Sequence, residues 1–209
     1  MSRIIDMRIS PAVALNAAVS ELEAGSLVII PTETVYGIAA LPKKERAVEA
    51  IFQLKGRSAH KAITLLTTDI VQASSLVKSE LIFDQLADAF WPGPLTIVTY
   101  RASGLDFRLG GDEETIGVRC PDHDLVRSLT STLGPLAVTS ANLSGQPTEV
   151  SADLAAAAVG NDLLVIDGGL CTGTPSTVIN LTKNPACLLR SGSISREDLL
   201  TVGLTLAEG

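Results

Sequence analysis

The sequence predicts a mixed α/β (α+β) fold in which helices flank a single sheet. Short apolar stretches alternate along the chain with longer stretches that have helical start and stop signals. Hydrophobic residues make up 46% of the 209 residues and aromatic residues only 3%, so we expect a core of Ala, Val, Leu and Ile. No internal repeat and no linker rich in Pro, Ser and Gly divides the chain, which predicts one domain.

Helices are predicted where capping residues flank an apolar stretch. Ser10 and Pro11 are typical of a helix start, and Gly25 follows where that helix would end. Gly56 is expected to end the next helix because glycine readily adopts the left-handed conformation found there. The predicted helices cover residues 11–24, 44–54, 79–90, 122–133, 151–158 and 195–202.

The predicted strands are short and mostly apolar. Residues 27–30 form a continuous apolar run that ends at Pro31, as expected of a strand buried on both faces. The other predicted strands cover residues 63–66, 95–100, 116–119, 136–138, 163–166, 177–181 and 186–189.

Charge and cysteine content limit the classes of function. The formal net charge is -7, which disfavours sequence-independent nucleic-acid binding but allows a small anionic ligand in a basic cleft. Three widely spaced cysteines (Cys120, Cys171, Cys187) and two histidines form no zinc pattern. With no signal peptide and no long apolar run, these features predict a cytoplasmic protein with reduced thiols and no membrane segment.

Polar and basic residues gather where predicted elements end. Thr32, Glu33 and Thr34 follow the strand at 27–30, either at a ligand site or in a turn that caps a helix. Lys55 and Arg57, with Lys61 close behind, suit a triphosphate; near a helix C-terminus they would equally complement the helix dipole.

Two further strand ends offer groups for anions. Arg119 ends a short apolar strand and needs a partner, either a substrate carboxylate or a protein carboxylate such as Glu33. The loop at 139–145 is rich in small hydroxyl residues and glycine, which can present hydroxyl and N–H groups to phosphates. Neither a Walker A nor a G-x-G-x-x-G pattern is present.

Three other features have structural or functional interpretations. Trp91, in the segment 91–96, forms either a pocket wall or a buried turn. Residues 167–177 repeat the strand, small-residue loop and strand pattern, and Arg190 is an isolated cation after the last strand. His60 and His123 fit no catalytic triad order, and His123 is expected at a helix start.

These segments together resemble the YrdC/Sua5 family of threonylcarbamoyl-AMP synthases, over residues 14–192 and in the short form without an extra C-terminal domain. The segments that carry the resemblance, in order, are Pro31-Thr32-Glu33-Thr34-Val35-Tyr36-Gly37, Lys55-Gly56-Arg57, Trp91-Pro92-Gly93-Pro94-Leu95-Thr96, Val118-Arg119-Cys120-Pro121, Ser140-Ala141-Asn142-Leu143-Ser144-Gly145 and Ser176-Thr177-Val178. The resemblance implies a YrdC-like domain, placed at 8–195, whose twisted mixed parallel and antiparallel sheet surrounds a concave basic cavity. Residues 196–209 are expected to form a C-terminal helix and tail.

The implied activity joins L-threonine, bicarbonate and ATP into threonylcarbamoyl-AMP and pyrophosphate, a nucleotidyl transfer. The product feeds the t6A modification of tRNA, so tRNA or other t6A-pathway proteins are possible partners. Mg²⁺ would arrive on the ATP phosphates, with no metal site of the protein's own.

The resemblance also implies roles for individual residues. Lys55 and Arg57 would be catalytic, and Lys55 would face the phosphates or the carbamate. The implied ATP-binding residues are Arg57, Lys61, Thr115, Ser140, Asn142, Thr148 and Arg190. The implied threonine-binding residues are Thr34, Arg119 and Ser176, with Arg119 pairing the substrate carboxylate.

The chain departs from the family pattern at three places. The run from Ser58 to Ile63 lacks the usual proline-containing sequence, Leu66 replaces a frequent histidine, and Pro175 replaces a glutamate. These departures bear on amino-acid specificity. Two alternatives therefore stand beside the synthase: an RNA-binding YrdC-like module without synthase activity, and a carbamoyl-adenylate enzyme that acts on another amine.

Overall fold

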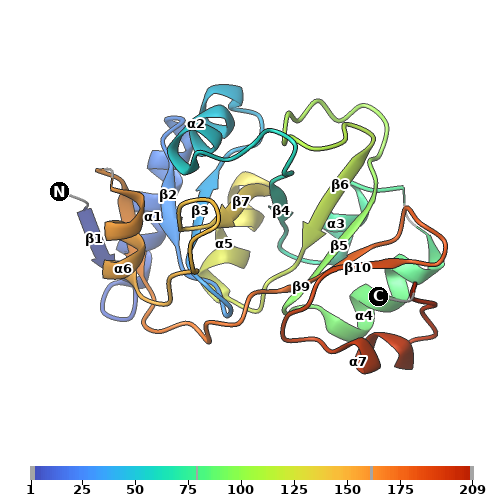
Figure 1. The fold of residues 1–209 in the computed structure, drawn as a ribbon. Helices are drawn as coiled ribbons and strands as arrows, with labels where there is room; N and C mark the ends of the chain where they lie inside the picture. The colour runs from blue at the N-terminus through green and yellow to red at the C-terminus, as the bar shows by residue number, and fades with distance from the viewer. Residues whose placement is uncertain (1–2, 79, 161, 208–209) are drawn as a thin grey trace.

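The strands form one ten-stranded mixed sheet in a computed structural model that describes residues 3–78, 80–160 and 162–207 (Figure 1). The strands are β1 (Arg3–Asp6), β2 (Val28–Ile30), β3 (Gly37–Ala40), β4 (Thr64–Leu66), β5 (Leu95–Tyr100), β6 (Thr115–Arg119), β7 (Leu136–Ser140), β8 (Leu164–Asp167), β9 (Thr177–Asn180) and β10 (Cys187–Arg190). Their order is β1-β8-β2-β3-β7-β4-β6-β5-β9-β10. β8 pairs in parallel with β1 and β2, as β6 does with β4 and β9 with β5, whereas the other pairs are antiparallel. The predicted mixed sheet is thus confirmed.

Helices cover both faces of the sheet, and the sheet lies between two hydrophobic cores. The helices are α1 (Pro11–Glu23), α2 (Glu45–Lys55), α3 (Ile70–Ser74), α4 (Leu81–Phe90), α5 (Asp124–Leu133), α6 (Ala152–Val159) and α7 (Arg196–Thr201). α1 and α5 pack in the smaller core, whereas α2, α4, α6 and α7 contribute to the larger one. In Figure 1, α4 and α7 lie beside the β5, β9 and β10 end of the sheet, away from α1 and α6.

Strand β2 is apolar throughout because both of its faces are covered. Val28 and Ile30 belong to the smaller core, whereas Ile29 between them belongs to the larger core. This follows from the alternation of side chains along a strand. Each fully buried isoleucine contributes roughly 1.5–3 kcal/mol through removal of apolar surface from water.

The predicted elements are all present, with ends shifted by at most a few residues. Gly56 follows α2 in the left-handed conformation, with φ of 56°, as predicted from sequence. His123 is the residue that precedes α5, in agreement with the predicted helix start. Ser79, the predicted start of the helix at 79–90, lies outside the described residues.

Three elements were missed: β1, β3 and α3. β3 has the sequence Gly-Ile-Ala-Ala, and glycine and alanine are depleted in strands. A Cβ atom at Gly37 would lie 2.6 Å from Val138 Cγ1, so β3 packs closely against β7. This packing, and not the strand propensity of its residues, makes the segment a strand. β1 is a partly exposed edge strand, and α3 has only five residues, so neither has a strong periodic signal.

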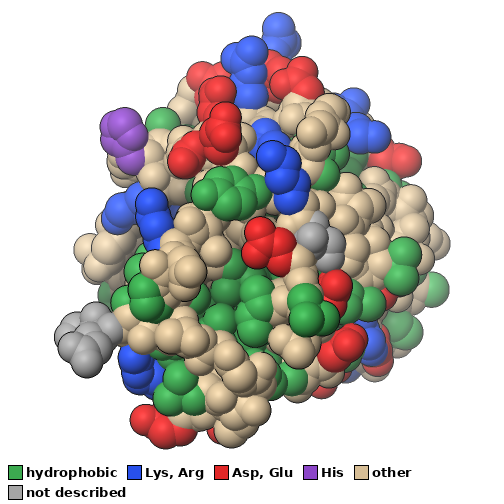
Figure 2. Space-filling view, turned by 90° about the vertical axis from the view of Figure 1, so that its right-hand side faces the viewer, with side chains coloured by type: hydrophobic (Ala, Val, Ile, Leu, Met, Phe, Trp, Pro, Cys, Tyr) green, Lys and Arg blue, Asp and Glu red, His purple; other side chains and the backbone are tan. Residues whose placement is uncertain are grey.

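Both ends of the described chain join the fold. β1 precedes residue 8, the predicted domain start, and pairs with β8. Leu199 of α7, in the predicted C-terminal helix and tail, is fully buried in the larger core. Figure 2 shows the face that carries α4, α7 and β10, where hydrophobic side chains gather near the middle; Leu81, Leu189 and Leu200 of these elements are exposed.

The three cysteines carry no disulfide. Within the described ranges, none of the helices has both the length and the apolar character needed to cross a membrane.

Candidate active site

A cavity of about 600 Å³ lies against one face of the sheet, from β3 and β7 to β9 and β10. Alternation along the strands forms its floor. Thr64 and Leu66 line the cavity, whereas Leu65 between them packs in the larger core. Likewise Thr96 and Val98 line it while Ile97 is in the core. One face of these strands therefore packs in the hydrophobic core, and the other presents hydroxyl groups and cations to the cavity.

The basic part of the cavity comes from Arg57, Lys61 and Arg190. Arg57 is held by its own loop, because its Nε donates to the Lys61 carbonyl at 3.0 Å and its Nη2 to the Ala62 carbonyl at 2.7 Å. Burial lowers the pKa of Arg57. Burial, followed by the nearby charges of Arg119 and Arg57, lowers the pKa of Arg190.

These cations lack acidic partners. None of the three forms an ion pair with a described residue, and no described Asp or Glu lines the cavity. Clustered cations in a concave site raise the local potential, even in a chain of net charge -7. The cavity is therefore suited to a polyanionic ligand.

Arg119 is the most firmly held cation of the cavity. Its guanidinium makes four hydrogen bonds: Nε to the Gly93 carbonyl, Nη1 and Nη2 to Thr34 Oγ1, and Nη2 to Glu33 Oε1 at 2.6 Å. Only 7% of the Arg119 side chain is exposed. Since a guanidinium has five N–H groups, one N–H on Nη1 lacks a partner among the described residues and can serve a ligand that enters the cavity.

The hydroxyl of Thr34 is fully used by the protein. Thr32 Oγ1 donates to the Val35 carbonyl at 2.6 Å, so it must be the acceptor in its 2.9 Å hydrogen bond with Thr34 Oγ1. Thr34 therefore donates to Thr32 and accepts from both nitrogens of Arg119. The Thr32-Glu33-Thr34 segment thus orients Arg119 as well as lining the cavity.

Ser176 joins the two parts of the site. Its Oγ accepts a 2.8 Å hydrogen bond from Arg190 Nη2 and lies 2.9 Å from Thr96 Oγ1. Its carbonyl accepts a second hydrogen bond from Arg190 Nε at 2.9 Å. The predicted threonine-binding Ser176 and the predicted ATP-binding Arg190 are therefore direct neighbours.

Lys55 is buried behind the loop that follows β7. Its ammonium donates to the carbonyls of Ser140 and Asn142 and to Asn142 Oδ1, the last at 3.2 Å. Burial, then the charge of Arg57, lowers the pKa of Lys55 to about 8. Lys55 does not line the cavity. Its ammonium is therefore not at the position expected for contact with the phosphates or the carbamate.

Asn142 holds the same loop from within. Its Oδ1 accepts from Ser140 Oγ at 2.5 Å, and its Nδ2 donates to the Gln146 carbonyl at 2.6 Å. Asn142 is buried and does not line the cavity, whereas Ser140 does. Lys55 and Asn142 together fix the position of Ser140.

The cavity brings most of the predicted site residues together. Those that line it are Thr34, Arg57, Lys61, Thr115, Arg119, Ser140, Thr148, Ser176 and Arg190. Thr32, which the sequence placed either at a ligand site or in a capping turn, also lines the cavity, whereas sequence reasoning missed Thr64 and Thr96 as lining residues. Thr64 and Thr96 could have been found as polar residues that alternate with apolar ones in a predicted strand.

The departures from the family pattern also reach the cavity, but Trp91 does not. Ala62, Leu66 and Pro175 are lining residues. Trp91 instead donates from Nε1 to the Leu95 carbonyl at 2.7 Å and packs edge-on against Phe83, which favours the buried-turn interpretation.

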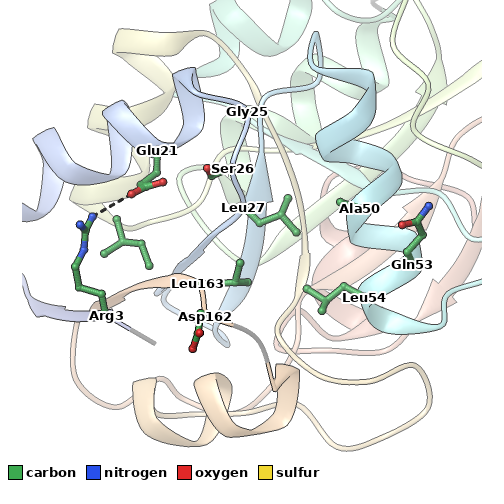
Figure 3. Close-up of a pocket in the computed structure, with 11 residues that line it drawn as sticks. Arg3, Glu21, Gly25, Ser26, Leu27, Ala50, Gln53, Leu54, Asp162 and Leu163 are labelled. Carbon is green, nitrogen blue, oxygen red and sulfur yellow. Dashed lines mark hydrogen bonds and ion pairs between the residues drawn. The ribbon is translucent and has the colours of Figure 1, made fainter. Parts of the chain in front are cut away.

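A second cavity, of about 700 Å³, lies between α1, α2 and the start of β8 (Figure 3). Arg3 and Glu21 form an exposed ion pair at one side of it, and Leu27, Leu54 and Leu163 are among its other lining residues (Figure 3). None of the predicted site residues reaches it. Its larger volume is therefore not matched by convergent cations or buried hydroxyls, and we assign the candidate site to the smaller cavity.

Comparison with known proteins adds a family and named relatives. A family model named Sua5/YciO/YrdC and described as "Telomere recombination" matches residues 20–192. The chain is 37% identical over 189 residues to a threonylcarbamoyl-AMP synthase of Pyrococcus abyssi, covering 88% of this chain and 56% of the relative. It is 36% identical over 191 residues to a putative threonylcarbamoyl-AMP synthase of Mycobacterium tuberculosis, covering 89% and 87%. The structure of P. abyssi Sua5 complexed with L-threonine matches with a TM-score of 0.89 and 34% identity, over 99% of this chain and 62% of that one. The chain thus spans little more than half of the archaeal relative.

Proposed function

Because the chain belongs to the Sua5/YciO/YrdC family, we propose that it is a threonylcarbamoyl-AMP synthase. It would use L-threonine, bicarbonate and MgATP, release pyrophosphate, and supply the t6A modification of tRNA. The observation that carries this proposal is a single cavity with two features. Arg57, Lys61 and Arg190 have no ion-pair partner among the described residues, and Arg119 is held rigidly by hydrogen bonds. The first feature suits a triphosphate, and the second suits an amino-acid carboxylate.

The proposed chemistry requires positioning and charge neutralisation rather than a covalent intermediate. The threonine amine attacks CO₂ with loss of a proton, or bicarbonate with loss of water, to form an N-carboxylate. An oxygen of this carbamate then attacks the α-phosphorus, a new P–O bond forms, and the bond to pyrophosphate breaks. Negative charge builds up on the phosphate oxygens during transfer, where fixed cations are most effective.

The nucleotide is proposed to occupy the basic part of the cavity. Arg57, Lys61 and Arg190 would neutralise the phosphates, and Ser140, Thr115 and Thr148 would contact the nucleotide. Magnesium would arrive with ATP, because no described carboxylate lines the cavity to hold it.

The amino acid is proposed to bind where Thr34, Arg119 and Ser176 meet. The N–H of Arg119 Nη1 that has no partner would take the carboxylate, and the hydroxyls of Thr96 and Ser176 lie on the same floor. Lys55 and Asn142 are proposed as positioning residues for Ser140, since neither lines the cavity.

Pyrophosphate release tests the proposal. The purified chain with MgATP and bicarbonate should release pyrophosphate only when threonine is added. Release with other amino acids but not with threonine would instead indicate a carbamoyl-adenylate enzyme for another amine. No release with any amine, together with RNA binding that weakens steeply with salt, would identify an RNA-binding module and refute the synthase.

A further inference from the structure

The buried serine and threonine hydroxyls of the cavity differ in whether their hydrogens are already used. Within the described ranges, the buried hydroxyls that line it are those of Thr32, Thr34, Thr96 and Ser176. Thr32 donates to the Val35 carbonyl, and Thr34 donates to Thr32. Thr32 and Thr34 therefore have no hydroxyl hydrogen left for a ligand.

The hydroxyls of Thr96 and Ser176, in contrast, have one hydrogen to spare. Their oxygens lie 2.9 Å apart, so one hydroxyl donates to the other. Apart from this contact, the described residues offer these two hydroxyls only Arg190 Nη2, which donates to Ser176 Oγ at 2.8 Å. Each hydroxyl carries one hydrogen, so one of the two hydrogens has no acceptor among the described residues. Because both side chains line the cavity, this hydrogen is available to a ligand there.

Arg190 decides which of the two hydroxyls keeps the spare hydrogen. Hydrogen bonds in a chain polarise one another, so a hydroxyl that accepts from a cation becomes a stronger donor and a weaker acceptor. Ser176 accepts from Arg190 and is therefore assigned as the donor to Thr96. The spare hydrogen is then on Thr96 Oγ1. This chain of donors starts at a cation, and its free end suits an anionic oxygen.

The sheet places Thr96 beside Arg119. Ile97 of β5 pairs with Val118 of β6 in an antiparallel ladder. The adjacent position of this ladder holds Thr96 and Arg119, and both side chains line the cavity. The Cβ atoms of such cross-strand neighbours are about 4.5–5.5 Å apart. The spare hydroxyl hydrogen and the partnerless N–H of Arg119 Nη1 therefore belong to neighbouring side chains.

We propose that Thr96 is a substrate-binding residue: its hydroxyl donates to one carboxylate oxygen of the amino acid, and Arg119 Nη1–H donates to the other. Ser176 is then a positioning residue, because it orients the Thr96 hydroxyl and does not itself donate to the carboxylate. This inference deepens the proposed function and rests on it for the identity of the amino acid.

Steady-state kinetics of threonine-dependent pyrophosphate release test the contact. Thr96→Val removes the hydroxyl but keeps a branched side chain that suits a strand. It should raise KM for threonine about tenfold, as expected for loss of a hydrogen bond to a charged group, and leave KM for ATP within about twofold. Thr96→Ala is a second variant without the donor and should give a similar rise. Thr96→Ser keeps the hydroxyl and should stay within about threefold of the unmodified protein.

Thr99→Val is the matched control for these variants. Thr99 is also a buried threonine of β5, but it does not line the cavity, so KM for threonine should not change. An unchanged KM for threonine in Thr96→Val, or an equal rise in KM for ATP, would overturn the proposal.

Ser176→Ala tests which hydroxyl touches the substrate. The Thr96 hydroxyl remains in this variant and can still donate, but it loses the polarising contact with Ser176. KM for threonine should therefore rise only about threefold, less than in Thr96→Val. A larger rise in Ser176→Ala than in Thr96→Val would show that Ser176 is the direct donor and would refute the assignment.

Binding measurements separate failure of this contact from failure of the proposed function. Isothermal titration calorimetry compares L-threonine with L-threoninol, in which a CH₂OH group replaces the carboxylate. Thr96→Val should raise the Kd of threonine about tenfold and that of threoninol less than about twofold. Equal effects on the two ligands would contradict a contact with the carboxylate. If the unmodified protein binds threonine but releases no pyrophosphate, the proposed function fails, whereas this comparison still decides the role of Thr96.

Discussion

Replacement of Lys55 by methionine is the sharpest test of how the loop after β7 is held. Methionine keeps most of the length and apolar volume of the lysine stem but has no donor. The ammonium donates to the carbonyls of Ser140 and Asn142 and to the Asn142 side chain. Lys55→Met therefore removes a donor from three acceptors in a buried region. The Ser140 carbonyl keeps the Asn142 backbone N–H and Asn142 Oδ1 keeps Ser140 Oγ, so the Asn142 carbonyl is the acceptor left without a donor among the described residues.

The expected loss of stability follows from these contacts. Each acceptor that stays buried and unpaired costs about 1–3 kcal/mol, but the loop can relax and admit water. The uncharged side chain also avoids the cost of burying an ammonium whose pKa is only about 8. We therefore expect a net decrease of roughly 2–4 kcal/mol in the free energy of unfolding.

The activity of Lys55→Met should fall because Ser140 loses its fixed position. Displacement of a positioned group by about 1 Å can cost about 10²-fold in rate. Urea denaturation and pyrophosphate release measure the two effects. Lys61→Met is the matched control, since Lys61 is an exposed lysine at the same cavity and should affect KM for ATP but not stability. If Lys55→Met abolishes activity and leaves stability unchanged, Lys55 contacts the substrate and the positioning role is wrong.

Three further predictions concern charge and close packing. Arg190→Gln should raise KM for ATP by about tenfold, since charged hydrogen bonds contribute about 1.5–3 kcal/mol, with KM at several salt concentrations as the measurement. The pKa of Lys55 in the folded chain lies near 8, below its ordinary value of 10.5, so between these pH values the folded chain binds fewer protons than the unfolded chain. The free energy of unfolding of the unmodified protein, relative to that of Lys55→Met, should therefore rise with pH from about 8 to 10.5. A fall would contradict the burial effect. Gly37→Ala should lower the free energy of unfolding by about 1–3 kcal/mol, because the new methyl group would lie 2.6 Å from Val138 Cγ1. An unchanged midpoint of thermal unfolding would contradict this and show that β3 and β7 can move apart at this position.

Sequence patterns predicted elements that depend on local signals and missed those that depend on packing. Gly56 and Pro11 mark helix ends through backbone conformation alone, so α1 and α2 were predicted closely. β3 is made of small residues that favour a strand only because β2 and β7 lie on either side. No local pattern carries that information.

The candidate site shows the same division. Arg57 and Arg119 were predicted from cations at element ends, and both line the cavity. Motif matching alone could not tell a residue that faces the cavity from one that lies behind it. Lys55 and Arg57 are two positions apart, yet the left-handed Gly56 sends one side chain under the loop at 140–146 and the other into the cavity.

The partition of acidic residues explains how a chain of net charge -7 forms a cationic cavity. The described carboxylates are absent from its lining, and the Glu33 carboxylate approaches from behind, in contact with Arg119. A carboxylate in that position lowers the net charge beside Arg119, where the amino acid is proposed to bind, but leaves the field of Arg57 and Arg190 uncompensated. In the proposed function, the triphosphate would thus be attracted by charge, whereas the amino acid would be selected mainly by the direction of hydrogen bonds. Changes in salt should therefore affect ATP binding far more than threonine binding.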